Sequence, residues 1–382
     1  MTTTQPPPLT PAALVRPAPA PTSPATPVPP ATSAAPVPAA SPAAPVPPAS
    51  PVLAATQAAA PDQDAGLRRE WQAPFGVDVR LTLSPHRRGG RDPAYRVDQA
   101  GAVWRTSLTP DGPGTLRVTS RGSDNTLVIG QAWGPGAAWL LDTLPAQLGV
   151  HDDLSGFTVH HAIVGELALR HPGLRVGRTG RLFEALVPAV LEQKVVGVEA
   201  HRAWRILLGK FGTPAPGPAP QGMRVVPPPR VWARIPSWDW HRAGVEGVRA
   251  RTIITAADVA SRLELALEHD LALALALDPD PDPDPAEADR RLRSLPGIGP
   301  WTSAEIRQRA AGDADAVSVG DYHLPKVVGW TLARQITDDA GMLELLAPYA
   351  GHRYRVSRLI ELGGIAPPRR GPRMSVRDYR AI

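Results

Sequence analysis

The sequence predicts an α+β protein that is mainly α: a small antiparallel sheet domain, then an all-helical domain, with a disordered N-terminal tail in front of both. Three observations lead to this prediction. The first sixty or so of the 382 residues are mostly Pro, Ala, Thr, Ser and Val, with Arg16 as the only charge. Short segments of alternating apolar and polar residues come next, and apolar residues at three- and four-residue spacing then continue almost to the C-terminus. The boundaries that follow are a tail at 1–65, an α+β domain at 66–154, a helical domain at 155–366 and a basic C-terminal tail at 367–382.

The N-terminal tail is predicted to be disordered for two physical reasons. Frequent Pro removes backbone donors and blocks helices, and small side chains bury too little apolar surface to offset the entropy lost on ordering. The tail has no continuous apolar stretch behind a compact positive start. We therefore expect neither a signal peptide nor a membrane anchor in it.

The α+β domain is predicted from alternation and turns. Residues 77–83, 103–108 and 115–119 alternate apolar and polar side chains, as half-buried strands do. The Gly- and Pro-rich residues 110–114 separate the last two segments and indicate a turn. Leu and Ala at helical spacing predict a helix over 137–148.

The helical domain is predicted from apolar residues on one face of each segment. The segments are 157–167, 182–208, 248–277, 286–295, 303–311 and 324–337. Residues 213–229 are predicted to be a loop. The end of the third segment, 271–277, alternates Leu and Ala as a strand would, but both are strong helix formers and a helix is favoured. The Asp-Pro repeat at 278–285 is interpreted as an extended, solvated spacer rather than a metal chelator, because its carboxylates repel one another.

Composition narrows the classes of function. The chain has no cysteine, which excludes disulfides, thiolate nucleophiles, zinc-cysteine sites and iron–sulfur clusters. The formal net charge is +5 and the basic residues are nearly all Arg. That prevalence has two explanations, GC-rich coding or a surface for phosphate groups, and it permits nucleic-acid binding without establishing it. His160, His161 and His201 are interpreted as surface or core histidines, since no second set of ligands has metal-site spacing. We expect a cytoplasmic protein.

The segment LPGIGPWT at 295–302 predicts a tight hairpin that ends in a helix. Gly297 and Gly299 let the chain reverse and bring bare backbone close to a ligand, and Pro300 suits the first turn of a helix. The free N–H groups of that turn can hold a phosphate without reading sequence. Because such hairpins also serve as passive DNA-binding elements or simple turns, the motif alone does not indicate chemistry.

The second motif is GDYHLPK at 320–326, about twenty residues further on. A short apolar segment precedes Asp321, so its carboxylate should be partly buried at the N-terminus of the next helix, with Tyr322 beside it. A carboxylate at a helix start is often only a helix cap, and that alternative stays open for Asp321.

The hairpin, its spacing to Asp321 and the helical segment 183–195 resemble the helix-hairpin-helix (HhH-GPD) superfamily of DNA glycosylases. The nearest type is the bacterial 3-methyladenine DNA glycosylase II. The resemblance runs from about Trp71 to Gly364, and the hairpin with the aspartate is its specific part. The amino-terminal sheet domain matches less closely.

The resemblance implies roles around the reacting bond. It makes Asp321 the catalytic carboxylate, which would stabilise the cationic sugar that forms as the base leaves. Trp301 stands where lyase members have a Schiff-base lysine, so no AP lyase activity is expected. Trp301, Tyr322 and Tyr349 would line the pocket for a flipped base and attract a cationic base through their rings. For Tyr349, ordinary core packing is an equal alternative.

The resemblance also implies DNA and cation contacts. Gly297, Ile298 and Gly299 would bind the DNA backbone, together with Gln193 and Lys194. Lys194 stands where the relatives have an apolar wedge residue. A lysine would fill the gap left by a flipped base poorly, but it can contact a phosphate of the DNA backbone. Gln193 contacts the strand or caps local backbone. The backbone carbonyls of Leu295, Gly297 and Ile298 would hold a monovalent cation, with no other cofactor expected.

The resulting hypothesis is a monomeric, monofunctional DNA glycosylase of base excision repair. It would bind duplex DNA with alkylated bases and hydrolyse the N-glycosidic bond of alkylated purines of the 3-methyladenine and 7-methylguanine type. Two alternatives are a non-catalytic helix-hairpin-helix DNA-binding protein and a glycosylase of the same superfamily for another lesion.

Overall fold

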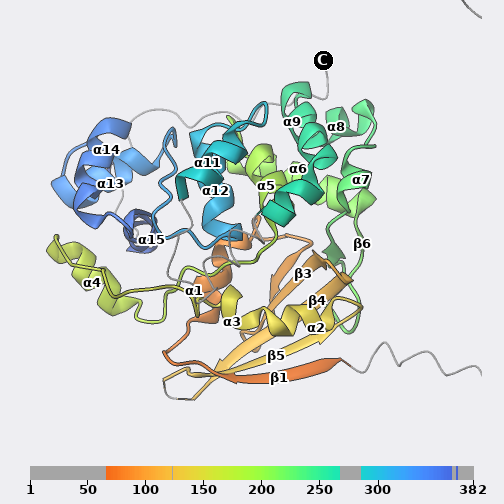
Figure 1. Cartoon of the computed structure of the whole chain (residues 1–382), viewed down its shortest axis with the longest axis horizontal. Helices are drawn as coiled ribbons and strands as arrows, with labels where there is room; N and C mark the ends of the chain where they lie inside the picture. The colour runs from red at the N-terminus through yellow and green to blue at the C-terminus, as the bar shows by residue number, and fades with distance from the viewer. Residues whose placement is uncertain (1–65, 123, 267–284, 364–366, 369–382) are drawn as a thin grey trace, which may run out of the picture. The chain divides into compact units, whose positions relative to one another are not determined.

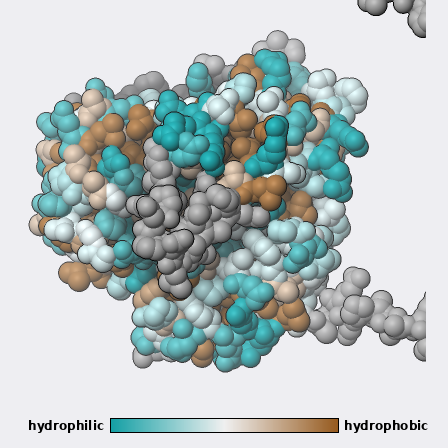
Figure 2. Space-filling model, in the orientation of Figure 1, coloured by the Kyte–Doolittle hydropathy of each residue, from teal (hydrophilic) through white to brown (hydrophobic). Residues whose placement is uncertain are grey.

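The computed structural model describes residues 66–122, 124–266, 285–363, 367 and 368. The predictions made for the tail at 1–65, for 271–277, for most of the Asp-Pro repeat and for nearly all of the basic C-terminal tail lie outside these residues. Within the described residues, no helix has the length and apolar character needed to cross a membrane. Hydrophilic and hydrophobic side chains are interspersed over the face shown in Figure 2.

A five-stranded antiparallel sheet forms the first part of the fold, with strand order β1-β5-β4-β3-β2. Helices α2 and α3 follow it in sequence, and α2 packs across β4 and β5 (Figure 1). Leu116 and Val128 on the sheet and Leu140 and Leu144 on the helices are fully buried in the core between them. The bounds are β1 Leu67–Gln72, β2 Tyr95–Val97, β3 Val103–Thr109, β4 Gly112–Arg121, β5 Leu127–Trp133, α2 Ala137–Asp142 and α3 Leu144–Gln147. The predicted strands at 103–108 and 115–119 and the predicted helix at 137–148 are confirmed.

The strand predicted at 77–83 is wrong, because this segment is helix α1 (Val79–Leu83), followed by a 3₁₀ turn at Ser84–His86. The Asp78 carboxylate accepts a hydrogen bond of 2.9 Å from the Leu81 amide and caps the helix. Val79 and Leu83 are buried four residues apart on one face, so the same alternating pattern also satisfies helical spacing.

The second part of the fold is helical, as predicted. Its helices are α4 Ala162–Arg170, α5 Leu182–Leu191, α6 Gly197–Phe211, α7 Pro229–Trp232, α8 Ser237–Ala243, α9 Gly247–Asp258, α11 Pro285–Arg293, α12 Pro300–Ala310, α13 Leu324–Ala333, α14 Asp339–Leu346 and α15 Arg353–Gly363. The segment predicted as one helix at 182–208 is divided into α5 and α6 by a turn in which Lys194 has a φ of +54°. The loop predicted at 213–229 contains a short ribbon of β6 (Thr213–Pro214) paired with β7 (Arg224–Val225). The mainly α, α+β fold class is confirmed.

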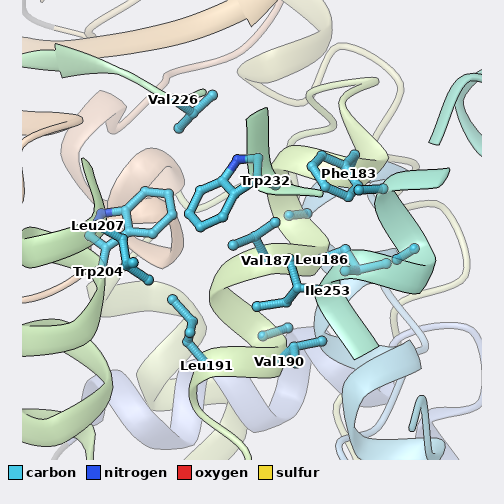
Figure 3. Close-up of a cluster of buried hydrophobic side chains, with 14 of the residues drawn as sticks. Phe183, Leu186, Val187, Val190, Leu191, Trp204, Leu207, Val226, Trp232 and Ile253 are labelled. Atoms are coloured by element: carbon cyan, nitrogen blue, oxygen red, sulfur yellow. The ribbon is translucent and has the colours of Figure 1, made fainter. Parts of the chain in front are cut away.

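Helix α5 is the central element of the helical part. It packs against α12 on one side and against α6 and α9 on another, while α13, α14 and α15 group with α4 further away (Figure 1). Almost every α5 side chain is buried, and Leu186 and Val190 have no measurable exposure. Figure 3 shows these side chains beside the two large rings of Trp204 and Trp232.

The sheet and the helices are joined through polar and ionic contacts. Glu184 on α5 accepts a hydrogen bond of 2.6 Å from the Ser107 hydroxyl on β3 and lies 3.6 Å from the Arg105 guanidinium. The Trp204 indole on α6 donates to Asp92, which precedes β2, at 2.8 Å. These side chains are buried or nearly so, and their geometry therefore fixes where the helices sit on the sheet.

Candidate active site

The hairpin lies between α11 and α12, where the sequence predicts it. Gly297 has a φ of +88°, and a Cβ at this position would overlap with the Thr252 side chain on α9. Ile298 is buried and anchors the turn in the helical core. Gly299 has open space where its side chain would be, directly in front of the first turn of α12. The sequence therefore builds a tight turn that leaves open space beside Gly299, at the start of α12.

Gln193 supports the hairpin from the end of α5. Its side-chain amide donates to the Gly297 carbonyl at 2.9 Å and to the Thr302 hydroxyl at 2.8 Å. Gln193 thus holds the backbone of the hairpin, which lies 104 residues further along the chain, and its contact with a DNA strand stays a prediction. Lys194, the next residue, is exposed in the turn between α5 and α6. Val198 nearby is also strongly exposed, an apolar side chain that sequence reasoning did not single out.

The carbonyls proposed for a monovalent cation already accept hydrogen bonds. The Gly297 carbonyl accepts from Gln193, and the Leu295 carbonyl accepts from the Ile298 amide at 3.1 Å. A cation would have to share both oxygens with these donors. The cation therefore stays a prediction.

Asp321 and Trp301 lie together, although twenty residues separate them. The Trp301 indole N–H, in the first turn of α12, donates to Asp321 Oδ2 at 3.0 Å. The other oxygen, Oδ1, accepts from the backbone amides of His323 and Leu324 at 2.7 and 2.8 Å. One carboxylate oxygen thus caps the start of α13, and the other points toward the indole. Three donors hold the half-buried group in one orientation.

A cavity of about 230 Å³ opens beside Asp321 and Trp301. Its walls come from the 3₁₀ turn at Ser84–His86, the C-terminal end of α5, α12, the loop before α13, the start of α13, and α15. The lining residues are Pro85, Glu192, Trp301, Glu305, Gln308, Arg309, Ala316, Ser318, Asp321, Leu324, Tyr354, Ser357, Arg358 and Glu361. Burial raises the pKa of Tyr354 to about 12, so its phenol stays protonated at neutral pH.

The structure does not bring Tyr322 or Tyr349 to this cavity. Tyr322 is 69% exposed, and its ring is covered by the Lys326 ammonium 3.5 Å from the centroid. Tyr349 is 2% exposed and packs in the core of α4, α13 and α15, where its hydroxyl lies 2.8 Å from His161 Nδ1. The base-pocket position expected for Tyr349 is therefore replaced by core packing, because the 3₁₀ turn at Ala347–Tyr349 directs the ring inward.

Several cavity residues were missed by the sequence reasoning. Glu305 and Gln308 follow Trp301 by one and two helical turns and share its face of α12. That spacing was readable once Trp301 had been chosen. Tyr354 and Arg358 reach the cavity from α15, and nothing local in the sequence indicates that α15 packs there. Among the described residues, no group of three histidine or acidic side chains is arranged to hold a metal ion.

Comparisons with known proteins agree with this geometry. No protein-family model matches the chain. Two curated Mycobacterium tuberculosis proteins, from strains CDC 1551 and H37Rv, are each described as a probable bifunctional transcriptional activator/DNA repair enzyme AlkA. They are 32% identical to it over 177 residues, which is 46% of this chain. The match spans 31% of the length of these relatives, so less than a third of each is represented.

Solved structures match over a larger part of the chain. A 3-methyladenine DNA glycosylase from Archaeoglobus fulgidus superposes with a TM-score of 0.59 at 15% identity, covering 77% of this chain and 97% of that one. An 8-oxoguanine glycosylase/lyase from Clostridium acetobutylicum in its apo form gives 0.55 at 12% identity, covering 78% and 99%. The protein MBOgg1, solved with a low-affinity DNA ligand, also gives 0.55, at 15% identity, covering 78% and 97%.

The fold is therefore that of the helix-hairpin-helix DNA glycosylases, and the resemblance expected from the sequence is confirmed. The sequence relatives that match part of the chain are both described as AlkA.

Proposed function

We propose that this protein is a monofunctional DNA glycosylase that hydrolyses the N-glycosidic bond of alkylated purines flipped out of duplex DNA. The observation that supports this most directly is the Asp321 carboxylate, which lines a cavity and is held by Trp301, a residue of the first turn of α12 directly after the hairpin. The AlkA-type relatives and the glycosylase fold support the same class of reaction.

The reaction that this geometry favours needs one fixed anion. As the bond between base and deoxyribose breaks, positive charge develops on the sugar, and a carboxylate already oriented by three hydrogen bonds stabilises it without reorganising. Asp321 can also orient the water that completes the hydrolysis. An alkylated purine carries positive charge before the bond breaks, so it leaves with little help from an acid.

Lyase chemistry needs an amine at the sugar, and the described cavity lining contains no lysine. Trp301 occupies the start of α12, where a Schiff-base lysine would be expected. We therefore propose that the product is an intact abasic site.

DNA binding in this proposal uses the hairpin and the turn at 192–196. A phosphate would occupy the open space beside Gly299 and accept hydrogen bonds from backbone amides of the hairpin, and Lys194 would contact the phosphate backbone from the turn after α5. These contacts position the duplex without reading its sequence. The protein acts as a monomer in this proposal.

The test is Asp321→Asn, assayed by release of methylated base from alkylated duplex DNA. We expect the single-turnover rate to fall by about 10²- to 10³-fold, the usual loss when a group that stabilises transition-state charge is removed. Asp338→Asn is the matched control, because Asp338 caps α14 in the same way, accepting from the Gly341 amide at 3.0 Å, but does not line the cavity. Release that Asp321→Asn leaves unchanged would remove the proposed role.

The same assay separates the two alternatives. A non-catalytic DNA-binding protein would bind duplex DNA with a clear salt dependence and release no base. A glycosylase for another lesion would release base from a deaminated or oxidised duplex instead of a methylated one. The oxidised duplex is included because one matching structure is an 8-oxoguanine glycosylase/lyase.

A further inference from the structure

The cavity beside Asp321 contains fewer aromatic rings than the sequence predicts. Of the three predicted rings, only Trp301 lines it, and Tyr354 adds one more. A cation–π attraction needs a ring face close to the positive charge. With only two rings in the lining, this attraction can contribute little to the binding of a cationic base. If the cavity prefers cationic bases, another feature must supply the preference.

The lining is instead anionic. It contains the four carboxylates Glu192, Glu305, Asp321 and Glu361 against the two arginines Arg309 and Arg358. Arg88, outside the lining, lies 3.5 Å from Glu192, which leaves an excess of one negative charge. Because protein surrounds part of the cavity, this excess attracts a cation more strongly than it would at the surface.

Glu305 is the carboxylate best placed to act on a base. It lies one helical turn after Trp301 on α12, and its side chain is 14% exposed. One oxygen accepts from the Ser318 hydroxyl at 2.7 Å, and the other lies 2.8 Å from an Arg309 nitrogen. Since each carboxylate oxygen can accept two hydrogen bonds, each has one position left for a ligand.

The partners of Glu305 hold it in one orientation, and Arg309 balances part of its charge. The Arg309 guanidinium is shared, because its Nε donates to the Pro85 carbonyl at 2.9 Å. Ser318 is itself fixed by the Gln308 amide at 3.0 Å. The carboxylate is therefore immobile and ready to accept a hydrogen bond before a base enters.

We propose that Glu305 determines the base specificity of this site: its carboxylate faces the flipped base, accepts an N–H of that base, and selects purines that carry a positive charge. This inference rests on the proposed function and identifies what performs the selection, an ionic contact in place of aromatic stacking. A neutral base gains only a hydrogen bond from Glu305, whereas an N-alkylated purine gains a hydrogen bond and a charge–charge attraction.

The experiment measures binding to lesions that the enzyme cannot cleave. A duplex with one 7-methylguanine on a 2′-fluoro sugar presents a cationic base, and a second duplex with 2′-fluoro hypoxanthine presents a neutral one. We expect Glu305→Gln to weaken binding of the first by about tenfold and of the second by less than about twofold, because only the first loses a charge–charge attraction. An equal loss on both duplexes, or no loss on either, would overturn the proposal.

Two further variants make the result specific. Glu361→Gln removes a carboxylate from the same lining, but that side chain is 48% exposed, so water screens its charge and we expect a smaller effect. An effect of Glu361→Gln as large as that of Glu305→Gln would contradict the assignment to Glu305. Should Glu305→Gln fail to fold, Glu305→Asp replaces it: the withdrawn carboxylate should lower the preference for the cationic duplex, and an unchanged preference would overturn the proposal.

Failure of the inference is distinguishable from failure of the proposed function. A wild-type protein that releases no methylated base and binds both lesion duplexes no better than undamaged DNA contradicts the proposed function itself. A wild-type protein that releases methylated base, with a preference that Glu305→Gln does not change, contradicts the role of Glu305 alone.

Discussion

Trp301 joins the two motifs of the site through a single hydrogen bond. Its position at the start of α12 is set by the hairpin, and its indole N–H fixes Asp321 Oδ2 at 3.0 Å. The ring and the N–H can therefore contribute separately, the ring to the wall of the cavity and the N–H to the orientation of the carboxylate.

Trp301→Phe separates the two contributions by keeping a ring and removing the donor. Hydrogen bonds to charged groups contribute about 1.5–3 kcal/mol, so we expect the single-turnover rate of base release to fall by roughly 10- to 100-fold. The control is Trp204→Phe, which removes an indole donor from Asp92, and neither of these two residues lines the cavity. That control should lower the melting temperature but leave the rate per folded molecule unchanged; equal rate losses in both variants would mean that the effect is structural.

The sequence could indicate the pairing of Asp321 with Trp301, but not the whole cavity. Both residues belong to short motifs whose backbone geometry is local, a hairpin and a helix start. Tyr349 shows why the rest could not be predicted: whether a ring in a 3₁₀ turn points to the core or to a cavity depends on α4, which packs from nearly two hundred residues away. Glu305 is intermediate, because its helical spacing from Trp301 is readable while its partner Ser318 is not.

At the scale of elements, the hairpin requires glycine at its two glycine positions for different reasons. At position 297, any Cβ atom would overlap with the Thr252 side chain, and the backbone has a positive φ that favours glycine. Gly299 has a φ of −99° and free space around it, so its small size matters only if something approaches from outside.

Gly297→Ala should consequently reduce the stability of the protein, and Gly299→Ala should reduce its affinity for DNA. We expect Gly297→Ala to lower the free energy of unfolding by about 2–3 kcal/mol, through overlap and backbone strain. Gly299→Ala should change it by less than about 0.5 kcal/mol, while the added methyl group obstructs a phosphate and weakens binding to undamaged duplex DNA. Chemical denaturation and DNA titration measure the two quantities. Destabilisation by Gly299→Ala with normal DNA affinity would contradict the assigned roles.

Among the elements, those with local signals were predicted and those that depend on partners were not. The strands β3 and β4 and most long helices follow from alternation or helical spacing. The apolar residues in 77–83 fit both the alternation of a strand and the spacing of a helix, and the hydrogen bond from the Leu81 amide to Asp78 favours the helix. The ribbon of β6 and β7 was not predicted, because two-residue strands have no periodicity and exist only through pairing, with β7 also lying against the sheet.

At the scale of the whole molecule, the sheet and the helices meet through buried cations and carboxylates. Arg105 faces Glu184 at 3.6 Å, and Arg88 lies 3.5 Å from Glu192 at the end of α5. Breaking one such pair leaves an uncompensated buried charge, so the arrangement specifies one orientation of the two parts. The same layer supports the candidate site, because Glu192 and Arg309 belong to the cavity lining.

His86 makes this layer sensitive to acid. It lies among the arginines of the layer, and its pKa is held well below 6.5, first by burial and then by Arg105, Arg309 and Arg88. In the unfolded chain, the histidine titrates near its ordinary pKa, so below pH 6.5 the unfolded state binds a proton that the folded state does not. The stability contributed by the neutral ring is therefore present above pH 6.5 and is lost as the pH falls below it.

His86→Gln keeps a neutral polar side chain and removes this titration. We expect the wild type to lose about 1 kcal/mol more stability than the variant between about pH 7.5 and pH 5.5, following the linkage between proton binding and unfolding. The measurement is the free energy of unfolding of both proteins at several pH values, taken as a difference because His151, His201 and His352 also have lowered pKa values and titrate in both proteins. Parallel pH curves would mean that His86 takes up a proton as readily in the folded state as in the unfolded chain, and that the carboxylates around the arginines offset their charge.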